Sequence, residues 1–306
     1  MRSTTMQHEM SEFDFVFLSY DEPNAESLYA ELLNQVPWAK RVHGVRGFDT
    51  AHRSCADAAD TDFFVTVDGD NRMHDSFLSV KINIEPEQHD HAWTWAGRNH
   101  VNGLVYGNGG LKLWSKQFVR TMHSHENSSD DASKVDFCWS HKYHDVFGTH
   151  STSVINGSAY QAWRSGYREG VKMSLENGRR VAPAEFIKKI WLYNLHKLLI
   201  WCSVGADVEH GIWSIFGARQ GAHDCNLTTD DHTQISDYNW FANKWQTVKD
   251  CDPLAASAIL GQKLRQGLGL DIADLDAQQS RFHKSVYLNP PRPMVSYDAI
   301  RHLAAV

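Results

Sequence analysis

Short apolar runs alternate with helix-like stretches along the N-terminal part of the chain. Residues 13–20 form an apolar run that ends abruptly at an Asp-Glu-Pro-Asn sequence, which predicts a buried strand followed by a loop. Residues 25–35 then place leucines at helical spacing. The apolar run within residues 61–67 is typical of a central parallel strand. This alternation predicts right-handed βαβ units and an α/β sheet.

The remaining elements are shorter and follow from the same patterns. Residues 40–45 are predicted to form a second strand, and residues 50–59 a helix capped by Asp49 or Thr50. Residues 123–133 are polar and typical of a mobile loop, and residues 238–306 are helical in pattern until a proline-rich break at 289–293. The other expected strands and helices lie at residues 78–84, 91–95, 111–114, 153–156, 159–175, 184–202 and 212–221.

The predicted elements divide the chain into a large domain and an extension. A chain of 306 residues with 42% hydrophobic content buries a substantial core. We expect an α/β domain over residues 13–225, with a mixed, mainly parallel sheet flanked by helices. A helical C-terminal extension is expected over residues 226–306.

Composition and charge narrow the function classes. The net charge of −7 and the pI near 6.2 argue against a protein that coats nucleic acid by bulk electrostatics. The five cysteines have no CxxC spacing, which favours neither a zinc site nor a disulfide framework. The polar residues 1–12 do not resemble a signal peptide, and no run of ~18 apolar residues follows. We therefore expect a cytoplasmic protein, in the host cytoplasm if it is viral, that does not enter a membrane.

The strongest chemical signal is Asp68-Gly69-Asp70 at the end of the third predicted strand. Open α/β sheets bind ligands at the carboxyl ends of their strands. Two carboxylates placed there repel each other unless a cation lies between them, and a hard divalent ion that also binds phosphate oxygens meets that need. The alternative is a solvated turn, because Asp-Gly is a common turn dipeptide. The position after a βα-type strand favours the metal site.

Several segments resemble a known family of enzymes. They are VFLSYDEPNA (16–25), KRVHGVRG (40–47), DFFVTVDGD (62–70), LVYGNGGLKL (104–113), WRSGYREGVK (163–172), WCSVGA (201–206) and FGARQG (216–221). Together they resemble bacteriophage glycosyltransferases of the GT-A fold, particularly the branch that adds sugars to 5-hydroxymethylpyrimidines in viral DNA. The resemblance covers most of residues 14–225. It specifies the fold more closely than the acceptor, because acceptors vary among similar enzymes.

The resemblance implies a divalent cation, Mn²⁺ or Mg²⁺, and a nucleotide-sugar donor. Asp70 is then the main metal ligand, and Asp68 shares the ion or contacts the ribose. A third ligand is expected from the later part of the domain, where His223 is preferred over His210.

Donor-binding residues are also implied by the resemblance. For the acidic residues among them, a helix N-terminus is an equally good explanation, and for the histidines an ordinary core or surface position is the alternative. The glycines belong to a segment that allows close backbone approach to a ligand, or that forms a plain hairpin turn. The expected set is Tyr20, Asp21, Glu22, His43, Gly44, His52, Asp68, Gly109 and Gly110.

Two tryptophans and two arginines are candidates for contacts with the acceptor or with phosphate. Trp93 and Trp95 lie on one face of a predicted strand and are suited to stack on a sugar or an extruded base, with core packing as the alternative. Arg164 and Arg168 share a helix face and are suited to hold a phosphate of the donor or of a DNA backbone. A solvated helix face is the alternative for the arginines.

Two carboxylates are candidates for the catalytic base. Glu169 is the first candidate for the group that deprotonates the acceptor hydroxyl in an inverting mechanism. Asp207 is the second, although its position before a helix is more typical of an N-cap. A retaining mechanism needs neither, and the sequence leaves the stereochemistry open.

These expectations describe a hexosyl- or pentosyltransferase that moves a sugar from a nucleotide diphosphate, UDP above all, to 5-hydroxymethylcytosine or a related pyrimidine in DNA. Such a base must be flipped out or reached through the major groove. The alternatives are the same chemistry on a surface polysaccharide or other saccharide acceptor, and an inactive carbohydrate- or nucleotide-binding module. A local basic face for DNA is expected from Lys112, Lys116, Arg120, Lys142, Arg164, Arg168, Lys172, Arg179 and Arg180.

Overall fold

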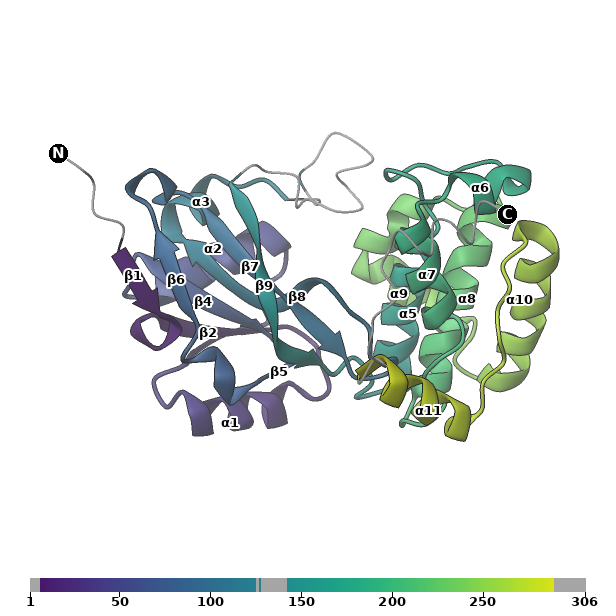
Figure 1. The fold of residues 1–306 in the computed structure, drawn as a ribbon, viewed down its shortest axis with the longest axis horizontal. Helices are drawn as coiled ribbons and strands as arrows, with labels where there is room; N and C mark the ends of the chain where they lie inside the picture. The colour runs from purple at the N-terminus through teal and green to yellow at the C-terminus, as the bar shows by residue number, and fades with distance from the viewer. Residues whose placement is uncertain (1–5, 125–126, 128–141, 289–306) are drawn as a thin grey trace.

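The protein combines a sheet with a separate layer of helices. The computed structural model describes residues 6–124, 127 and 142–288. Figure 1 shows a sheet lobe, which we define as residues 6–154, beside a helical lobe of residues 159–288. The expected α/β class is confirmed. The loop predicted at 123–133 and the helix break at 289–293 lie largely outside the described residues.

One seven-stranded sheet of order β3-β2-β4-β8-β7-β9-β5 organises the sheet lobe. Three neighbouring pairs are parallel and three antiparallel, so the sheet is evenly mixed and not mainly parallel as expected. Two of the antiparallel pairs arise because β8 turns back on β7 and lies against β4, and the third joins β5 to β9. The strands span Lys40–His43 (β3), Asp14–Ser19 (β2), Phe63–Asp68 (β4), Val105–Ser115 (β8), Ala92–Asn99 (β7), Tyr143–Ser153 (β9) and Asn71–Met73 (β5); Met6–Glu9 (β1) pairs separately with Lys81–Ile84 (β6).

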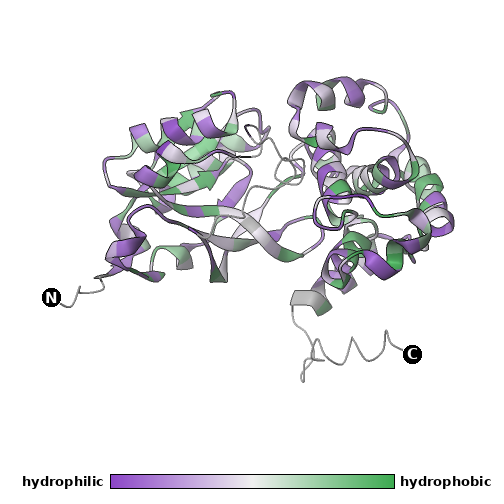
Figure 2. Ribbon diagram, turned by 90° about the horizontal axis from the view of Figure 1, so that it is seen from above, coloured by the Kyte–Doolittle hydropathy of each residue, from purple (hydrophilic) through white to green (hydrophobic). Residues whose placement is uncertain are grey.

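Both faces of the sheet are buried. Because alternate residues of a strand point to opposite faces, Phe15 and Phe17 pack on one side and Val16 on the other. The first side is covered by α1 (Ala25–Gln35), and the second by α2 (Phe48–Ala58) and α3 (Lys116–Thr121). Figure 2 shows apolar residues on the strands and on the helix faces next to them. Each fully buried phenylalanine contributes about 1.5–3 kcal/mol, so this double-sided core holds β2 and β4 firmly in place.

The helix α2 begins earlier than predicted. Its first residue is Phe48 and its N-cap is Gly47, so neither Asp49 nor Thr50 caps it. The Asp49 carboxylate is buried and accepts the backbone N–H of Ser124 at 3.1 Å. The predicted cap is wrong because this carboxylate binds a distant segment instead of its own helix.

The glycine-rich segment at residues 107–110 is not a hairpin turn, since it lies inside β8. β8 crosses β7 so closely that a Cβ added to Gly109 would lie 1.9 Å from the Gly97 nitrogen. The crossing coincides with a register shift between the two strands. The hairpin-turn alternative does not describe this segment, because glycine here allows the close approach of two backbones. The strand predicted at 153–156 is also displaced, because β9 ends at Ser153.

The helical lobe is built around α5 and α8, whose backbones touch. A Cβ added to Gly166 of α5 would lie 2.0 Å from the Ser214 oxygen of α8, and one on Gly217 would lie 2.1 Å from the Trp163 oxygen. The helix predicted at 184–202 is interrupted between α6 and α7. Within the described residues, none of the helices is long and apolar enough to span a membrane. The α-helices span Ala159–Met173 (α5), Phe186–Lys189 (α6), Leu192–Trp201 (α7), Gly211–Leu227 (α8), Tyr238–Gln246 (α9), Pro253–Leu268 (α10) and Ala277–Leu288 (α11); short 3-10 helices span Met10–Glu12, Asp75–Phe77, Pro86–Gln88, Pro183–Glu185 and His232–Ser236.

Residues 226–288 pack as part of the helical lobe. Arg219 of α8 is buried and donates to the Cys202 oxygen at 2.7 Å, to the Ser257 oxygen of α10 at 2.8 Å and to the Asp274 carboxylate at 2.6 Å. These bonds join α8 to the chain that follows it. Figure 1 shows α9, α10 and α11 beside α5 and α8 in the helical lobe, and the domain boundary expected at residue 225 stays a prediction.

Candidate functional site

Three carboxylates meet at one edge of the sheet, and we call Glu22, Asp68 and Asp70 the acid tip. β2 and β4 are parallel neighbours, so their carboxyl ends lie at the same edge. Asp68 is the last residue of β4, and Glu22 follows the end of β2. A Cβ added to Gly69 would lie 2.6 Å from Glu22 Oε2, which places the Glu22 carboxylate against the Asp68-Gly69-Asp70 turn. The predicted position of these aspartates at a strand end is confirmed.

Negative charge accumulates at the acid tip. Burial raises the pKa of Asp70 to about 6, and the nearby charges of Asp68 and Glu22 add to this effect. Burial also raises the pKa of Glu22, although the Tyr20 backbone N–H donates to Glu22 Oε2 at 2.7 Å and opposes the shift. A cationic ligand at this edge would therefore relieve an existing repulsion.

The protein supplies two cations near the acid tip, each already oriented by an aspartate. Lys112 of β8 is buried, and its Nζ lies 3.0 Å from Asp68 Oδ2. Arg164 of α5 reaches across from the helical lobe, with Nη1 at 3.5 Å from Asp21 Oδ2. The Arg164 side chain is 12% exposed, and its charge lowers the pKa of both Asp70 and Glu22. Arg164 is thus the helical lobe's contribution to the site.

Asp70 is held in place by its neighbours. Asn71 Nδ2 donates to Asp70 Oδ1 at 2.7 Å, and Ser153 Oγ donates to Asn71 Oδ1 at 3.1 Å. Gly110 has a φ of +76°, and a Cβ there would lie 2.2 Å from Asn71 Nδ2. Gly110 therefore makes room for the residue that orients Asp70. The glycine segment was expected to contact a donor or acceptor, and in the structure its Gly110 packs against Asn71.

The donor set of the acid tip fits a divalent cation that binds together with a substrate. Carboxylate oxygens are the ligands that Mg²⁺ and Mn²⁺ prefer, and Mg²⁺ commonly binds through one or two carboxylates and substrate phosphates. Among the described residues, no three His, Cys, Asp or Glu side chains form a ready ligand set. The role of His223 as third ligand stays a prediction, since its Nδ1 lies 3.0 Å from Asp224 Oδ1 in this structure.

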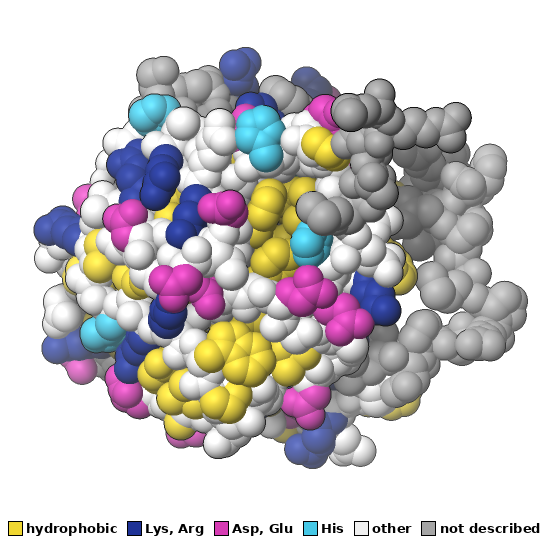
Figure 3. All heavy atoms as spheres, turned by 90° about the vertical axis from the view of Figure 1, so that its left-hand side faces the viewer, with side chains coloured by type: hydrophobic (Ala, Val, Ile, Leu, Met, Phe, Trp, Pro, Cys, Tyr) yellow, Lys and Arg dark blue, Asp and Glu magenta, His cyan; other side chains and the backbone are white. Residues whose placement is uncertain are grey.

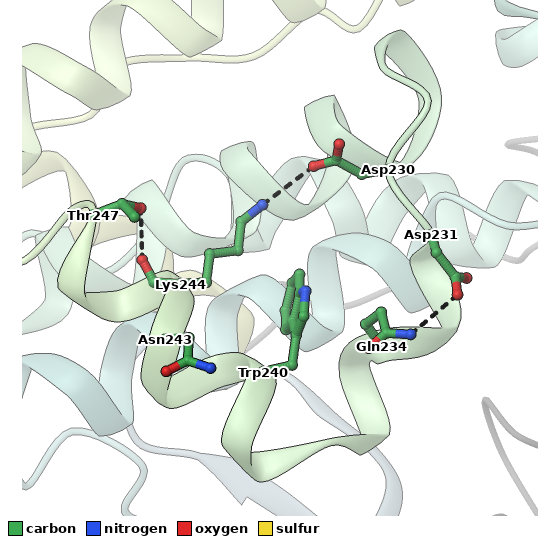
Figure 4. Close-up of a pocket in the computed structure, with 7 residues that line it drawn as sticks. All are labelled: Asp230, Asp231, Gln234, Trp240, Asn243, Lys244 and Thr247. Atoms are coloured by element: carbon green, nitrogen blue, oxygen red, sulfur yellow. Dashed lines mark hydrogen bonds and ion pairs between the residues drawn. The ribbon is translucent and has the colours of Figure 1, made fainter.

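His223 belongs instead to a polar network of the helical lobe. Its Nδ1 lies 3.0 Å from Asp224 Oδ1, and Asp224 also pairs with Lys244 at 2.7 Å and accepts the Tyr167 hydroxyl at 3.0 Å. Lys244 lies 3.3 Å from Asp230 as well. Figure 4 shows this lysine at a groove of about 540 Å³ whose polar side chains largely bind one another. The groove is lined by Asp230, Asp231, Gln234, Trp240, Asn243, Lys244 and Thr247.

The histidines expected near the nucleotide lie in two different environments. His43, next to Gly44, ends β3 at the same edge as the acid tip, and its Nδ1 lies 3.0 Å from Ser19 Oγ. His52 is 2% exposed, with its ring stacked on Phe48 at 4.0 Å. Burial lowers the pKa of His52 to about 4. His52 is a neutral core residue, and its expected place in the pocket is wrong because its side of α2 faces the sheet.

Trp93 and Trp95 are also core residues. Trp95 is fully buried, and its ring meets Phe77 edge-on at 5.0 Å. Trp93 is 4% exposed and packs in the same cluster. Neither ring offers a free face for stacking, so the core alternative describes them.

Glu169 lies in a second polar cluster, where the helical lobe meets β8. It accepts a hydrogen bond from the Tyr106 hydroxyl, and Lys172 Nζ lies 4.0 Å from its Oε1. The Tyr106 oxygen in turn accepts the Trp201 indole N–H at 2.8 Å. Arg168, the residue before Glu169 on α5, has its Nε buried without a hydrogen-bond partner in the described structure. The structure thus gives Glu169 a defined orientation but no contact with the acid tip.

Asp207 is neither an N-cap nor an exposed base. α8 begins after His210, and Asp207 pairs with Lys284 of α11 at 2.7 Å. The Asp207 side chain is 5% exposed. Its role is to fasten α11 to the loop before α8, which the sequence could not show because the two residues are far apart along the chain.

Three of the basic residues expected to face DNA are paired with carboxylates, and the expected basic face stays a prediction. Lys112 and Arg164 are largely buried and paired, and Lys142 pairs with Asp90. On the face in Figure 3, basic and acidic side chains are interspersed. No model of a known protein family matches the chain, and no curated protein matches it.

Proposed function

We propose that the protein is a metal-dependent glycosyltransferase of the GT-A type, which transfers a sugar from a nucleotide diphosphate, UDP in the first instance. The observation that carries this proposal is the acid tip, where the pKa of Asp70 is raised to about 6, together with Arg164, which pairs with the adjacent Asp21 and whose charge lowers the pKa of Asp70 and Glu22. Carboxylates for a cation and an arginine for a phosphate are the two groups that a diphosphate leaving group requires.

Asp70 and Asp68 would hold the divalent ion, which supplies charge neutralisation to the departing diphosphate when bound. Asn71 keeps Asp70 oriented, and Lys112 does the same for Asp68. Arg164 stabilises phosphate charge from the opposite side, in a site fixed before the reaction begins. The protein's own part in catalysis is therefore positioning and electrostatics.

Glu169 remains the proposed base for an inverting mechanism. The Tyr106 hydroxyl donates to one of its oxygens, which leaves the carboxylate fixed in a half-buried position. In the proposed step, Glu169 accepts the proton of the acceptor hydroxyl as the sugar bond forms. A Glu169→Gln variant with full activity would show that Glu169 is not the base, and the anomeric configuration of the product then distinguishes inversion from retention.

The proposed acceptor is the hydroxyl of 5-hydroxymethylcytosine, or a related hydroxymethylpyrimidine, in DNA. This part rests on the sequence resemblance alone. A second candidate is a saccharide acceptor, which needs no clustered Lys and Arg, whereas a duplex-binding face does.

One experiment tests donor, acceptor and metal together. The protein is incubated with Mn²⁺, a panel of nucleotide sugars, and DNA with or without 5-hydroxymethylcytosine, and the released nucleosides are analysed by mass spectrometry. We expect a sugar-linked nucleoside only from the modified DNA, and none after treatment with a chelator. Transfer to oligosaccharides alone would support the second acceptor. Nucleotide-sugar binding without any transfer, unchanged by Asp70→Ala, would show a binding module.

A further inference from the structure

Two tyrosines from different lobes meet beside the acid tip, and we call them the tyrosine ledge. Tyr20 follows β2 directly, and Tyr238 is the first residue of α9. Their ring centroids lie 5.7 Å apart at an interplanar angle of 58°. Tyr20 is 38% and Tyr238 51% exposed, so the pair presents aromatic surface to solvent.

Arg164 lies beneath this ledge. Its guanidinium carbon is 4.9 Å from the Tyr238 ring centroid and 5.5 Å from that of Tyr160. The same guanidinium pairs with Asp21, the residue after Tyr20. A ligand that rests on the exposed ring of Tyr238 is thereby brought next to a largely buried cation, which is the arrangement that a ring joined to a phosphate requires.

The backbone under each ring is fixed by a local hydrogen bond. The Tyr20 N–H donates to Glu22, a member of the acid tip, at 2.7 Å. Tyr238 follows the N-cap Asp237, whose carboxylate accepts the Asn239 N–H at 2.8 Å. Rigid aromatic rings of this kind give large contact area at a low cost in conformational entropy.

We infer that the tyrosine ledge stacks on the pyrimidine ring of a nucleotide whose phosphate lies toward Arg164. This inference rests on the proposed function and adds Tyr238 to it, as a binding residue from a region to which the sequence analysis assigned no role. Aromatic stacking is tolerant of the base, and the pyrimidine belongs either to the uridine of the donor or to the acceptor DNA. The proposed site is complete only when α9 is docked against the sheet lobe.

The test measures binding by calorimetry, in the presence of Mn²⁺, for uridine, UDP and a single-stranded oligo-dC. The variants are Tyr238→Ala, Tyr238→Phe and, as a control, Phe282→Ala, which removes another aromatic ring that is 70% exposed. Stacking is worth about 1–3 kcal/mol per base, so Tyr238→Ala is expected to weaken binding about 5- to 150-fold. Tyr238→Phe and Phe282→Ala should remain within twofold of the natural protein.

The ligand that responds identifies the source of the pyrimidine. Equal losses for uridine and UDP place the donor base on the ledge, whereas a loss for oligo-dC alone places the acceptor there. A loss for UDP but not for uridine would overturn the inference, because Tyr238 would then act only through Arg164. Unchanged binding of all three ligands by Tyr238→Ala, with sugar transfer intact, would overturn the ledge and leave the proposed function standing. A natural protein that binds none of them would overturn both.

Discussion

Carboxylates gather in two places in this protein, and their surroundings differ. At the acid tip, Asp70 and Glu22 are crowded together and their pKa values are raised. In the helical lobe, Asp224 forms an ion pair with Lys244 and hydrogen bonds with Tyr167 and His223, all within 3.0 Å. An acidic group with several built-in partners serves structure. A cluster of carboxylates that repel one another destabilises the folded protein, and its presence is better explained by the binding of a cationic ligand.

The largest expected effect is the loss of sugar transfer when a carboxylate of the acid tip is replaced. Asp70→Asn should lower sugar transfer about 100- to 1000-fold, the cost of losing a preorganised electrostatic partner. The same change should raise the free energy of unfolding by about 1 kcal/mol, since it removes a repelled charge. Transfer assays and urea unfolding at pH 7.5 check both, with Asp57→Asn, an exposed aspartate of α2, as the control. A variant that loses stability along with activity would contradict this account.

A buried group that stays neutral provides a second contrast. His52 has a pKa of about 4 in the folded protein, against an ordinary value of 6.5. Between these values the unfolded chain binds more protons at His52, so the contribution of His52 to stability should fall by about 3 kcal/mol as the pH drops from 7 to 4. Asp70, whose pKa is raised, contributes in the opposite direction over the same range.

Urea unfolding from pH 7 to pH 4 measures this loss. The difference in the free energy of unfolding between His52→Leu and the natural protein should change by about 3 kcal/mol over that range in favour of the variant at low pH, whereas for His89→Gln, which changes an exposed histidine, the difference should stay constant. Equal pH profiles for His52→Leu and the natural protein would show that His52 is not the group responsible.

In the polar network of the helical lobe, loss of a carboxylate should lower stability and leave sugar transfer unchanged, which is the opposite of the result expected at the acid tip. Asp224→Asn leaves Lys244 without its closest carboxylate and should lower the free energy of unfolding by about 2 kcal/mol. Sugar transfer per folded molecule should stay within twofold. A large fall in turnover at unchanged stability would mean that the network, and the groove in Figure 4, takes part in the reaction.

The smallest expected effect concerns the metal. At ten times its dissociation constant, Mn²⁺ should add about 1.4 kcal/mol to the free energy of unfolding, because it binds the folded state alone. Thermal unfolding with Mn²⁺ and with a chelator measures this difference. Asp70→Asn should abolish it, and Asp224→Asn should preserve it. An equal gain in all three proteins would place the ion elsewhere.

Local patterns identified the elements that carry the acid tip. The helix expected at residues 25–35 has those bounds, and the strand that delivers Asp68 was recognised from its apolar run. These features depend on neighbours in sequence, where periodicity is informative. What failed depends on distant partners: the return of β8 against β4, the pairing of Asp207 with Lys284, and the burial of His52.

Tyr238 illustrates the limit most clearly. Nothing in its local sequence distinguishes it from any tyrosine at the start of a helix. Its contact with Tyr20 exists only because the fold brings the start of α9 next to the end of β2. A residue of this kind is recognised from the assembled fold and not from a motif.

The glycine contact between α5 and α8 has a mechanical consequence for catalysis. Because no side chains lie between α5 and α8, contact between the two backbones sets the distance between the helix axes. This distance also fixes the position of Arg164, which lies half a turn from Gly166 on α5. A single methyl group added at Gly166 would act as a wedge. We expect it to move the guanidinium away from Asp21 and so to weaken the phosphate contact proposed for Arg164.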